Sequence, residues 1–158
     1  MSEFDLLGRQ LEALLSAESD PLANTANFVA LIHDAMTETN WTGVYLLRDG
    51  ELVLGPFQGK PACTRIPLGQ GVCGTAAKLD ETQRIADVHA FEGHIACDPA
   101  SRSELVVPLR TDSGVVAVLD IDSPVEERFS ADDQAEIESL CRIFERALGN
   151  PGLEKLVS

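Results

Sequence analysis

Apolar residues change their spacing along this chain, and that change restricts the fold more than any other feature. Over residues 4–16, 20–36 and 130–148 they recur three and four positions apart, which predicts amphipathic helices. Residues 42–54 and 104–122 carry short runs rich in valine and leucine that are typical of strands. Helices on both sides of a strand-rich middle predict an α+β domain, in which helices pack on an antiparallel sheet.

Capping and turn residues mark the limits of the first elements. Asp20 followed by Pro21 predicts a helix start, because aspartate caps free N–H groups and proline suits the first helical position. The predicted buried stripe of this helix comprises Leu22, Phe28, Val29, Ile32 and Met36. Asp49-Gly50 predicts a tight hairpin turn between strands at 42–47 and 51–54.

The remaining helices carry similar signals. Ser130 and Asp133 have the spacing of a capping box, and Gly149 with Pro151 predicts the end of the last helix. A short helix is predicted over Thr75–Leu79.

The composition is that of a soluble globular protein and excludes several partners. The chain has 158 residues, of which 44% are apolar, and a net charge of −14. Nucleic acids and anionic lipids attract surfaces rich in Lys and Arg, so neither is an expected partner. No apolar run is long enough to span a membrane, and the first residues lack the features of a signal peptide. We therefore expect a cytoplasmic location.

Two aspartates share one face of the strand predicted at 114–122. Asp120 and Asp122 follow Val116 and Val118 on that face, because side chains alternate along a strand. The opposite face carries Val115, Ala117, Leu119 and Ile121. Carboxylates at the end of a buried strand are costly without cationic partners. They indicate either a solvated strand end or the wall of a polar pocket.

The aromatic residues of the first strand form a second pattern. Trp41, Gly43 and Tyr45 alternate onto one face, and the glycine leaves room beside the two rings. The rings either pack in the core or form a slot for an apolar group.

The irregular middle of the chain, residues 55–103, holds three of the four cysteines, which are Cys63, Cys73 and Cys97. Cys141 lies instead on the apolar stripe of the last helix, where a thiol behaves as a small hydrophobe. With His94, the three cysteines could ligate zinc, although such sites usually contain short C-x₂₋₄-C pairs. A redox reaction needs one attacking thiolate and a second thiol that closes a disulfide, and the glycine-rich flanks permit the necessary motion.

Cys97 has an unusual position among acids. It lies between His94 and Asp98, with Glu104 further along the chain. Neighbouring carboxylates raise the pKa of a thiol and disfavour the reactive thiolate. Either Cys97 is structural, or the acids serve a substrate that Cys97 attacks.

Four stretches of the chain resemble one family, the free methionine-(R)-sulfoxide reductases, which are built on a GAF-type domain. The stretches are NWTGVYLL, LGPFQGKPACTRIPLGQGVCGTA, RIADVHAFEGHIACDPASRSELVVPL and VAVLDIDSP. The resemblance covers nearly the whole chain. It implies a single GAF-like domain over 1–158, with about six antiparallel strands and the N- and C-terminal helices on one face. The N-terminal helices would occupy 1–38, the sheet and active-site loops 40–124, and the C-terminal helix 130–148.

The resemblance also implies roles for individual residues. Cys97 in GHIACD corresponds to the nucleophile, Cys63 in PACTRI to the main resolving cysteine, and Cys73 in GVCG to a second thiol that can take over the disulfide. The implied substrate-binding residues are the aromatic Trp41 and Tyr45 and the acidic Asp98, Glu104, Asp120 and Asp122.

The implied reaction reduces free L-methionine-(R)-S-oxide to methionine. Carboxylates would hold the ammonium group that a methionine within a peptide lacks, and a protonated one would donate to the sulfoxide oxygen. Cys97 would become a sulfenic acid and then form a disulfide with Cys63, which thioredoxin would reduce. We expect no cofactor and no metal, and a homodimer is common for small domains of this kind.

Two alternatives remain open. One is a GAF-type module that senses a small molecule or the redox state without turnover. The other is a structural domain stabilised by zinc.

Overall fold

The computed structural model describes residues 2–95 and 97–158. In chain order its elements are α1 (Glu3–Ser16), α2 (Pro21–Ala35), β1 (Trp41–Arg48), β2 (Glu51–Gly59), β3 (Arg65–Pro67), α3 (Gly71–Leu79), β4 (Gln83–Ile85), the 3₁₀-helix η1 (Val88–Ala90), β5 (Ser103–Thr111), β6 (Gly114–Ser123) and α4 (Ala131–Val157).

The six strands form one sheet in the order β3-β2-β1-β6-β5-β4, and each neighbouring pair is antiparallel. This arrangement confirms the predicted α+β class and the number of strands. Asp49 and Gly50 have φ angles of 50° and 79°, as the tight turn between β1 and β2 requires. The edge strands β3 and β4 are each three residues long, so the long strands lie inside the sheet.

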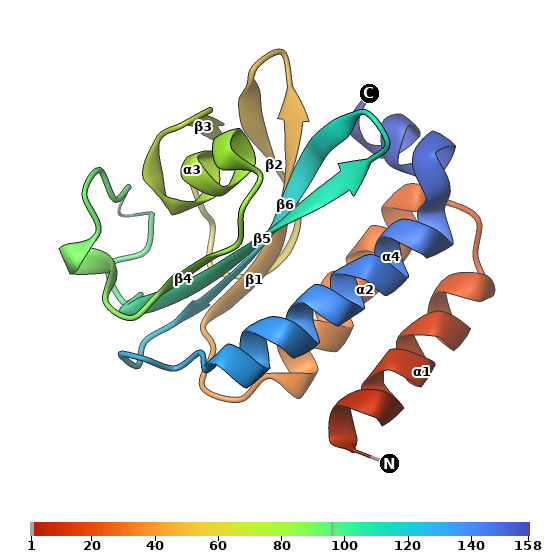
Figure 1. The fold of residues 1–158 in the computed structure, drawn as a ribbon, viewed down its shortest axis with the longest axis horizontal. Coiled ribbons are helices and arrows are strands. Elements are labelled where there is room, and N and C mark those ends of the chain that lie inside the picture. Colours follow the sequence, from red (N-terminus) through yellow and green to blue (C-terminus); the bar gives the residue numbers. More distant parts are fainter. Residues whose placement is uncertain (1, 96) are drawn as a thin grey trace.

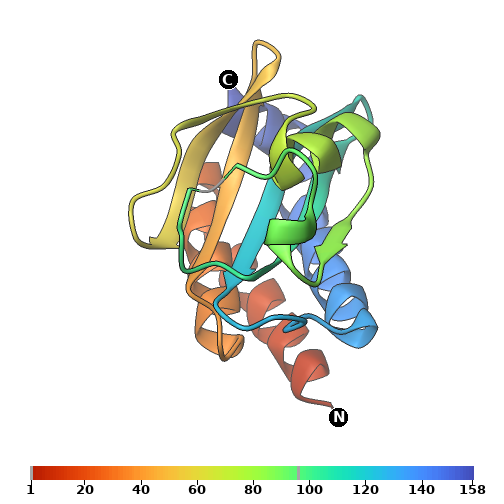
Figure 2. The ribbon, with the colours of Figure 1, turned by 90° about the vertical axis from the view of Figure 1, so that its left-hand side faces the viewer.

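The sheet separates two hydrophobic clusters. On one face α2 and α4 lie against the strands and α1 packs on both helices, which confirms that the terminal helices share a face (Figure 1). The rings of Phe28 and Phe144 stack there with their centroids 4.2 Å apart. The opposite face carries α3 and the segments that connect the short strands, which Figure 2 shows lying across the sheet. The helical face stabilises the domain, and the other face is left for a site.

The capping prediction for α2 is confirmed, but one residue of its buried stripe is wrong. Asp20 Oδ1 accepts hydrogen bonds from the backbone N–H groups of Leu22 and Ala23 at 2.9 and 3.0 Å. The Leu22 side chain, however, is 60% exposed. The buried stripe instead continues from Phe28 back to Thr25 and Pro21, three and four positions apart, as the helical period requires.

The C-terminal helix begins as predicted and ends later. Ser130 and Asp133 form the reciprocal capping box. Gly149, with φ 67°, interrupts the helix at the predicted end, but a further helical segment follows to Val157. Proline is tolerated in the first turn of a helix, so Pro151 can begin this second helical segment rather than end helical structure. Its apolar residues Leu153 and Leu156 are buried in the core of the helical face.

The alternation predicted for β6 holds at its acidic end and fails at its beginning. Val115 packs in the cluster beneath α3 and Val116 packs in the cluster beneath α2 and α4, which is the reverse of the prediction. The register with β5 shifts between Leu109 and Arg110. An irregularity of this kind exchanges the two faces of a strand, and the sequence pattern does not reveal it.

Two other boundaries differ from the prediction. α3 begins at Gly71 rather than at Thr75, and β2 continues beyond residue 54 to Gly59. The glycines disguise the start of α3, because glycine is a poor helix former. Gly74 is required by packing, since a Cβ atom there would lie 2.5 Å from the carbonyl oxygen of Pro67.

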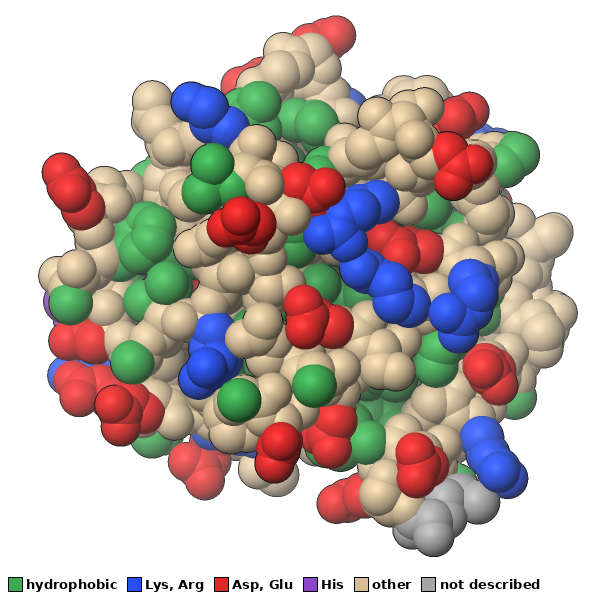
Figure 3. Space-filling model, in the orientation of Figure 1, with side chains coloured by type: hydrophobic (Ala, Val, Ile, Leu, Met, Phe, Trp, Pro, Cys, Tyr) green, Lys and Arg blue, Asp and Glu red, His purple; other side chains and the backbone are tan. Residues whose placement is uncertain are grey.

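The chain carries 26 acidic residues and 12 Lys or Arg residues. On the face drawn in Figure 3, acidic side chains are scattered, with basic side chains among them. Among the described residues, no helix is both long and apolar enough to cross a membrane.

Candidate functional site

A pocket opens on the face of the sheet that α3 covers. The strands β1, β5 and β6 form its floor, and the loops that carry Cys63 and Cys97 lie around it. The predicted site residues that line it are Trp41, Tyr45, Cys73, Cys97, Asp98, Glu104, Asp120 and Asp122. Residues far apart in the sequence therefore meet in one place, and Cys63 joins them through its bond to Cys97.

Three carboxylates form the acidic floor, defined here as Glu104, Asp120 and Asp122. Glu104 on β5 pairs directly with Asp122 on β6, and Asp120 lies two residues before Asp122 on the same face. Glu104 and Asp120 are only 7% and 5% exposed. Within the described residues, Asp120 Oδ1 is buried and has no hydrogen-bond partner. A buried acceptor of this kind is suited to a ligand that brings hydrogen-bond donors.

Burial raises the pKa of each acid in the floor well above its ordinary value. The next cause is a neighbouring carboxylate, which is Asp120 for Glu104, Asp122 for Asp120 and Glu104 for Asp122. Neighbouring carboxylates repel one another once they are charged, so the three acids cannot all ionise easily. The floor therefore retains protons above the pH at which an exposed carboxylic acid loses them, as the crowding of acids predicts.

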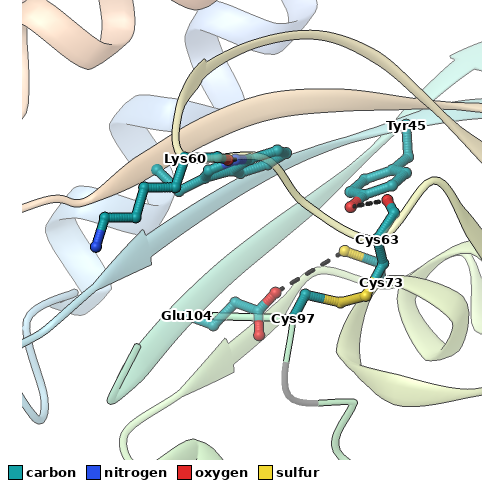
Figure 4. The surroundings of a disulfide bond; sticks show 7 residues. Tyr45, Lys60, Cys63, Cys73, Cys97 and Glu104 are labelled. Atoms are coloured by element: carbon teal, nitrogen blue, oxygen red, sulfur yellow. Dashed lines mark hydrogen bonds between the residues drawn. A yellow bond between two sulfur atoms is a disulfide. The ribbon is translucent and has the colours of Figure 1, made fainter. Parts of the chain in front are cut away.

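Cys73 lies beside the acidic floor. It comes from the first turn of α3, is buried, and its Sγ lies 3.8 Å from Glu104 Oε2, the contact drawn as a dashed line in Figure 4. Burial raises the pKa of this thiol well above its ordinary value, and the nearby carboxylates Asp120 and Glu104 add to the effect. A thiol in these surroundings stays protonated and can donate to a carboxylate.

Cys63 and Cys97 form a disulfide above the floor. Their Cα atoms lie 5.5 Å apart across a sequence separation of 34 residues. The loop that carries Cys63 connects β2 to β3, and the Cys97 segment connects η1 to β5. The pairing that the resemblance implied is thus present, whereas Cys73 and Cys141 are free and buried. Cys141 lies in the core of the helical face, as predicted.

The aromatic residues of β1 form one wall, and of the two alternatives for Gly43 the structure shows packing rather than a slot. The ring centroids of Trp41 and Tyr45 lie 5.8 Å apart, and the Trp41 ring also stacks on Phe57 at 5.4 Å. A Cβ atom on Gly43 would lie 2.3 Å from the Trp41 ring and 2.7 Å from Phe57 Cβ. The indole ring itself therefore fills the space that the glycine leaves, and that space does not serve a ligand.

Asp98 lines the pocket and is hydrogen-bonded to Asn40, a contact that the sequence did not suggest. Asn40 donates from Nδ2 to Asp98 Oδ2 at 3.0 Å and to Ser101 Oγ at 3.2 Å. These bonds anchor the Cys97 segment to the start of β1. Asn40 and Asp98 are 58 residues apart, and no local pattern could have indicated their pairing.

The zinc alternative does not fit this geometry. Two of its four ligands, Cys63 and Cys97, are bonded to each other, and a disulfide sulfur is not a thiolate ligand. Among the described residues, the ligand atoms that lie close together are those of Cys73, Glu104 and Asp120, all within 4.8 Å of one another. His94 lines the pocket, where burial and then the nearby His89 lower its pKa.

Comparisons with known proteins agree with this geometry. The family model described as GAF domain matches residues 23–148. A relative from Escherichia coli (strain K12), named free methionine-R-sulfoxide reductase, is 50% identical over 149 residues, which span 94% of this chain and 90% of the relative.

Two solved structures have the same architecture. The structure of fRMsr of Staphylococcus aureus in its reduced form superimposes with a TM-score of 0.90 at 46% identity, over 94% of this chain and 97% of that chain. The free methionine-R-sulfoxide reductase from Neisseria meningitidis, in complex with its substrate, superimposes with a TM-score of 0.89 at 40% identity, over 96% of this chain and 90% of that chain.

Proposed function

This chain belongs to the free methionine-(R)-sulfoxide reductases of the GAF domain family, and we propose that it reduces free L-methionine-(R)-S-oxide to L-methionine. The observation that carries the proposal is a disulfide-bonded cysteine pair directly beside a cluster of three acids, of which Glu104 and Asp120 are buried. The cysteines supply two electrons, and the acids recognise and protonate the substrate.

The acidic floor explains why the substrate is a free amino acid. An ammonium group brings three donors, which match the acceptors of Glu104, Asp120 and Asp122. Asp120 Oδ1, buried without a partner among the described residues, is the acceptor in greatest need of one. A methionine within a peptide has no ammonium group to offer, so its binding would leave these acids uncompensated. The aromatic wall of Trp41 and Tyr45 suits the methyl group on sulfur.

The chemical step transfers oxygen from the substrate sulfur to Cys97. The Cys97 sulfur attacks the sulfoxide sulfur while an acid of the floor donates a proton to the sulfoxide oxygen. The oxygen then moves from the substrate sulfur to the Cys97 sulfur while the transient bond between the two sulfurs breaks and its electron pair stays on methionine, and the thiol proton replaces the one that the acid gave. Methionine gains two electrons, and Cys97 becomes a sulfenic acid. The raised pKa of the floor supports this role, because it keeps a proton available at a pH at which an exposed carboxylic acid has lost it.

Resolution and recycling complete the cycle. The Cys63 thiol attacks the Cys97 sulfenic acid, a sulfur–sulfur bond forms, and water leaves. Cys73 is the proposed second thiol, which could take over the disulfide. A dithiol protein such as thioredoxin would reduce the disulfide, and no bound cofactor takes part. We also propose that the enzyme acts in the reducing cytoplasm, and a homodimer remains a prediction.

The decisive assay is NADPH consumption coupled through thioredoxin and its reductase. Free L-methionine-(R)-S-oxide is compared with the free S epimer and with a peptide that contains methionine sulfoxide. We expect turnover with the free R form alone. Turnover with the peptide would contradict the role given to the acids. No turnover with any substrate, even with dithiothreitol as reductant, would favour a GAF-type sensor instead.

A further inference from the structure

The loop that carries Cys63 is held by side chains from β1. Residues 60–63 have neither helical nor strand structure. Trp41 donates from Nε1 to the carbonyl oxygen of Lys60 at 3.1 Å. Tyr45 donates from its hydroxyl to the carbonyl oxygen of Cys63 itself at 2.9 Å, as the dashed line in Figure 4 shows. The second bond fixes the backbone of the cysteine and leaves its sulfur free for the disulfide.

Tyr45 is a rigid support for this bond. Its side chain is 2% exposed, and its ring stacks on Trp41. β1 lies at the centre of the sheet, where Tyr45 pairs with Leu54 on one side and Val118 on the other. Burial, and then the nearby Asp120, raise the pKa of the hydroxyl above its ordinary value, so the hydroxyl remains a donor. The position of Cys63 is therefore set by a buried side chain on the inner strand β1.

Cys97, the other cysteine of the disulfide, lies in a segment that is hydrogen-bonded to the residue before β1. Asn40, which directly precedes β1, donates to Asp98 and Ser101 on the Cys97 segment. Besides the disulfide, each of the two sulfur-bearing loops has its own hydrogen bond to β1 or to the residue before it. This arrangement can persist when the sulfur–sulfur bond is reduced.

We propose that the Tyr45 hydroxyl is a positioning group for disulfide formation, in which it holds Cys63 within reach of the Cys97 sulfenic acid. The inference rests on the proposed function for its reaction but assigns Tyr45 a task separate from contact with the substrate methyl group. The ring faces the pocket, and the hydroxyl serves the resolving loop. The step it assists is the one in which the Cys63 thiol displaces water from the sulfenic acid.

Removal of the hydroxyl lowers the effective concentration of Cys63 at Cys97. A reaction between two held groups is faster than one between mobile groups because their orientation is already set. We expect about a tenfold decrease, which corresponds to the loss of one hydrogen bond worth about 1.4 kcal/mol. Tyr45→Phe retains the ring and removes only the donor, so it isolates this effect.

The first test is a single turnover without external reductant, in which methionine, disulfide and trapped sulfenic acid are followed in time. In Tyr45→Phe the ratio of the disulfide-forming rate to the methionine-forming rate should fall about tenfold, and sulfenic acid should accumulate. Thr25→Val is the matched control, because it removes another buried hydroxyl that donates to a carbonyl oxygen, that of Pro21 at 2.7 Å, on the helical face. It should leave the ratio at the wild-type value. A wild-type ratio in Tyr45→Phe, or an equal decrease of both rates, would overturn the proposal.

A second measurement is independent of the substrate. Equilibration of the Cys63–Cys97 disulfide with reduced and oxidised glutathione gives the effective concentration of the two thiols. Tyr45→Phe should lower this value about tenfold, and Thr25→Val should not. If wild-type protein forms no methionine, the proposed function fails while this titration still decides the positioning role. An unchanged effective concentration would refute it.

Discussion

The four cysteine sulfurs of this protein have three different surroundings, and their roles follow from them. Cys63 and Cys97 are bonded in loops beside the pocket, Cys73 lies among buried acids, and Cys141 lies in the apolar core. We expect Cys97→Ser to abolish methionine formation, because it removes the attacking sulfur. Cys63→Ser should form about one methionine per enzyme molecule before it stops, if Cys73 cannot resolve the sulfenic acid. Product counting in a burst experiment checks both results, with Cys141→Ala as the control. Steady turnover by Cys97→Ser would contradict the assignment.

The acidic floor makes the activity depend on pH in a defined direction. The proton donor must be protonated, and burial raises the pKa of all three acids. The rate should therefore be highest below the raised pKa and fall as the pH rises through it. Glu104→Gln, Asp120→Asn or Asp122→Asn should lower kcat/KM by about 10²- to 10⁴-fold where the residue is the acid. A pH profile of kcat/KM, with the exposed Glu12→Gln as control, identifies the donor. If kcat/KM does not fall as the pH rises, acid catalysis by the floor is contradicted.

The same acids should destabilise the fold at neutral pH. A raised pKa means that the folded state holds its proton more tightly than the unfolded chain does. The stability associated with Asp120 is fully present below its ordinary pKa of 3.8 and is lost as the pH rises through the folded-state value. Asp120→Asn should therefore increase the free energy of unfolding by about 1–3 kcal/mol at pH 8 and by less at pH 4. Urea unfolding at both pH values checks this. An equal change at both would show that the effect is not one of ionisation.

At the scale of the elements, local patterns predicted the helices and the four long strands, whereas the short strands β3 and β4 lie in the stretch 55–103 that we expected to be irregular. The capping residues of α2 and α4 and the face shared by Asp120 and Asp122 could be predicted, because periodicity and capping act within a few residues. The position of Glu104 opposite Asp122 depends on the register of β5 with β6, which no local pattern specifies. The hydrogen bond from Asn40 to Asp98 was unpredictable for the same reason. The roles of individual residues came from the resemblance rather than from the spacing.

Gly43 shows how one missing side chain shapes an element. Its missing side chain allows Trp41 and Phe57 to close over β1, and a Cβ atom would lie within 2.7 Å of both side chains. We expect Gly43→Ala to destabilise the fold by about 1–3 kcal/mol, because overpacking displaces the ring. Gly8→Ala on α1 is the control, since its Cβ atom would meet only the flexible end of Ile143 at 3.3 Å. Thermal unfolding with tryptophan fluorescence checks both variants. Wild-type stability of Gly43→Ala would show that the aromatic wall can move.

At the scale of the whole molecule, the redox state should change the stability. The Cys63–Cys97 bond closes a loop with a sequence separation of 34 residues that contains β3, α3 and β4. A cross-link of this span restricts the unfolded chain and stabilises the folded state by about 2–4 kcal/mol. Reduced protein should therefore unfold at a lower urea concentration than oxidised protein. Cys63→Ser should behave like reduced protein under both conditions. Equal midpoints for the oxidised and reduced protein would contradict this expectation.

The short edge strands β3 and β4 have a consequence for behaviour at high concentration. Other chains can form hydrogen bonds with the unpaired backbone groups on the outermost strands of a sheet, and this pairing begins many aggregates. Here each outermost strand has three residues, and basic Arg65 and Arg84 lie on them. On each of these two strands a neighbouring molecule finds only three residues, one of them basic, with which to pair. β1 and β6, which carry Trp41, Tyr45, Asp120 and Asp122, pair with a strand on each side, so the part of the sheet that forms the pocket lies away from these edges.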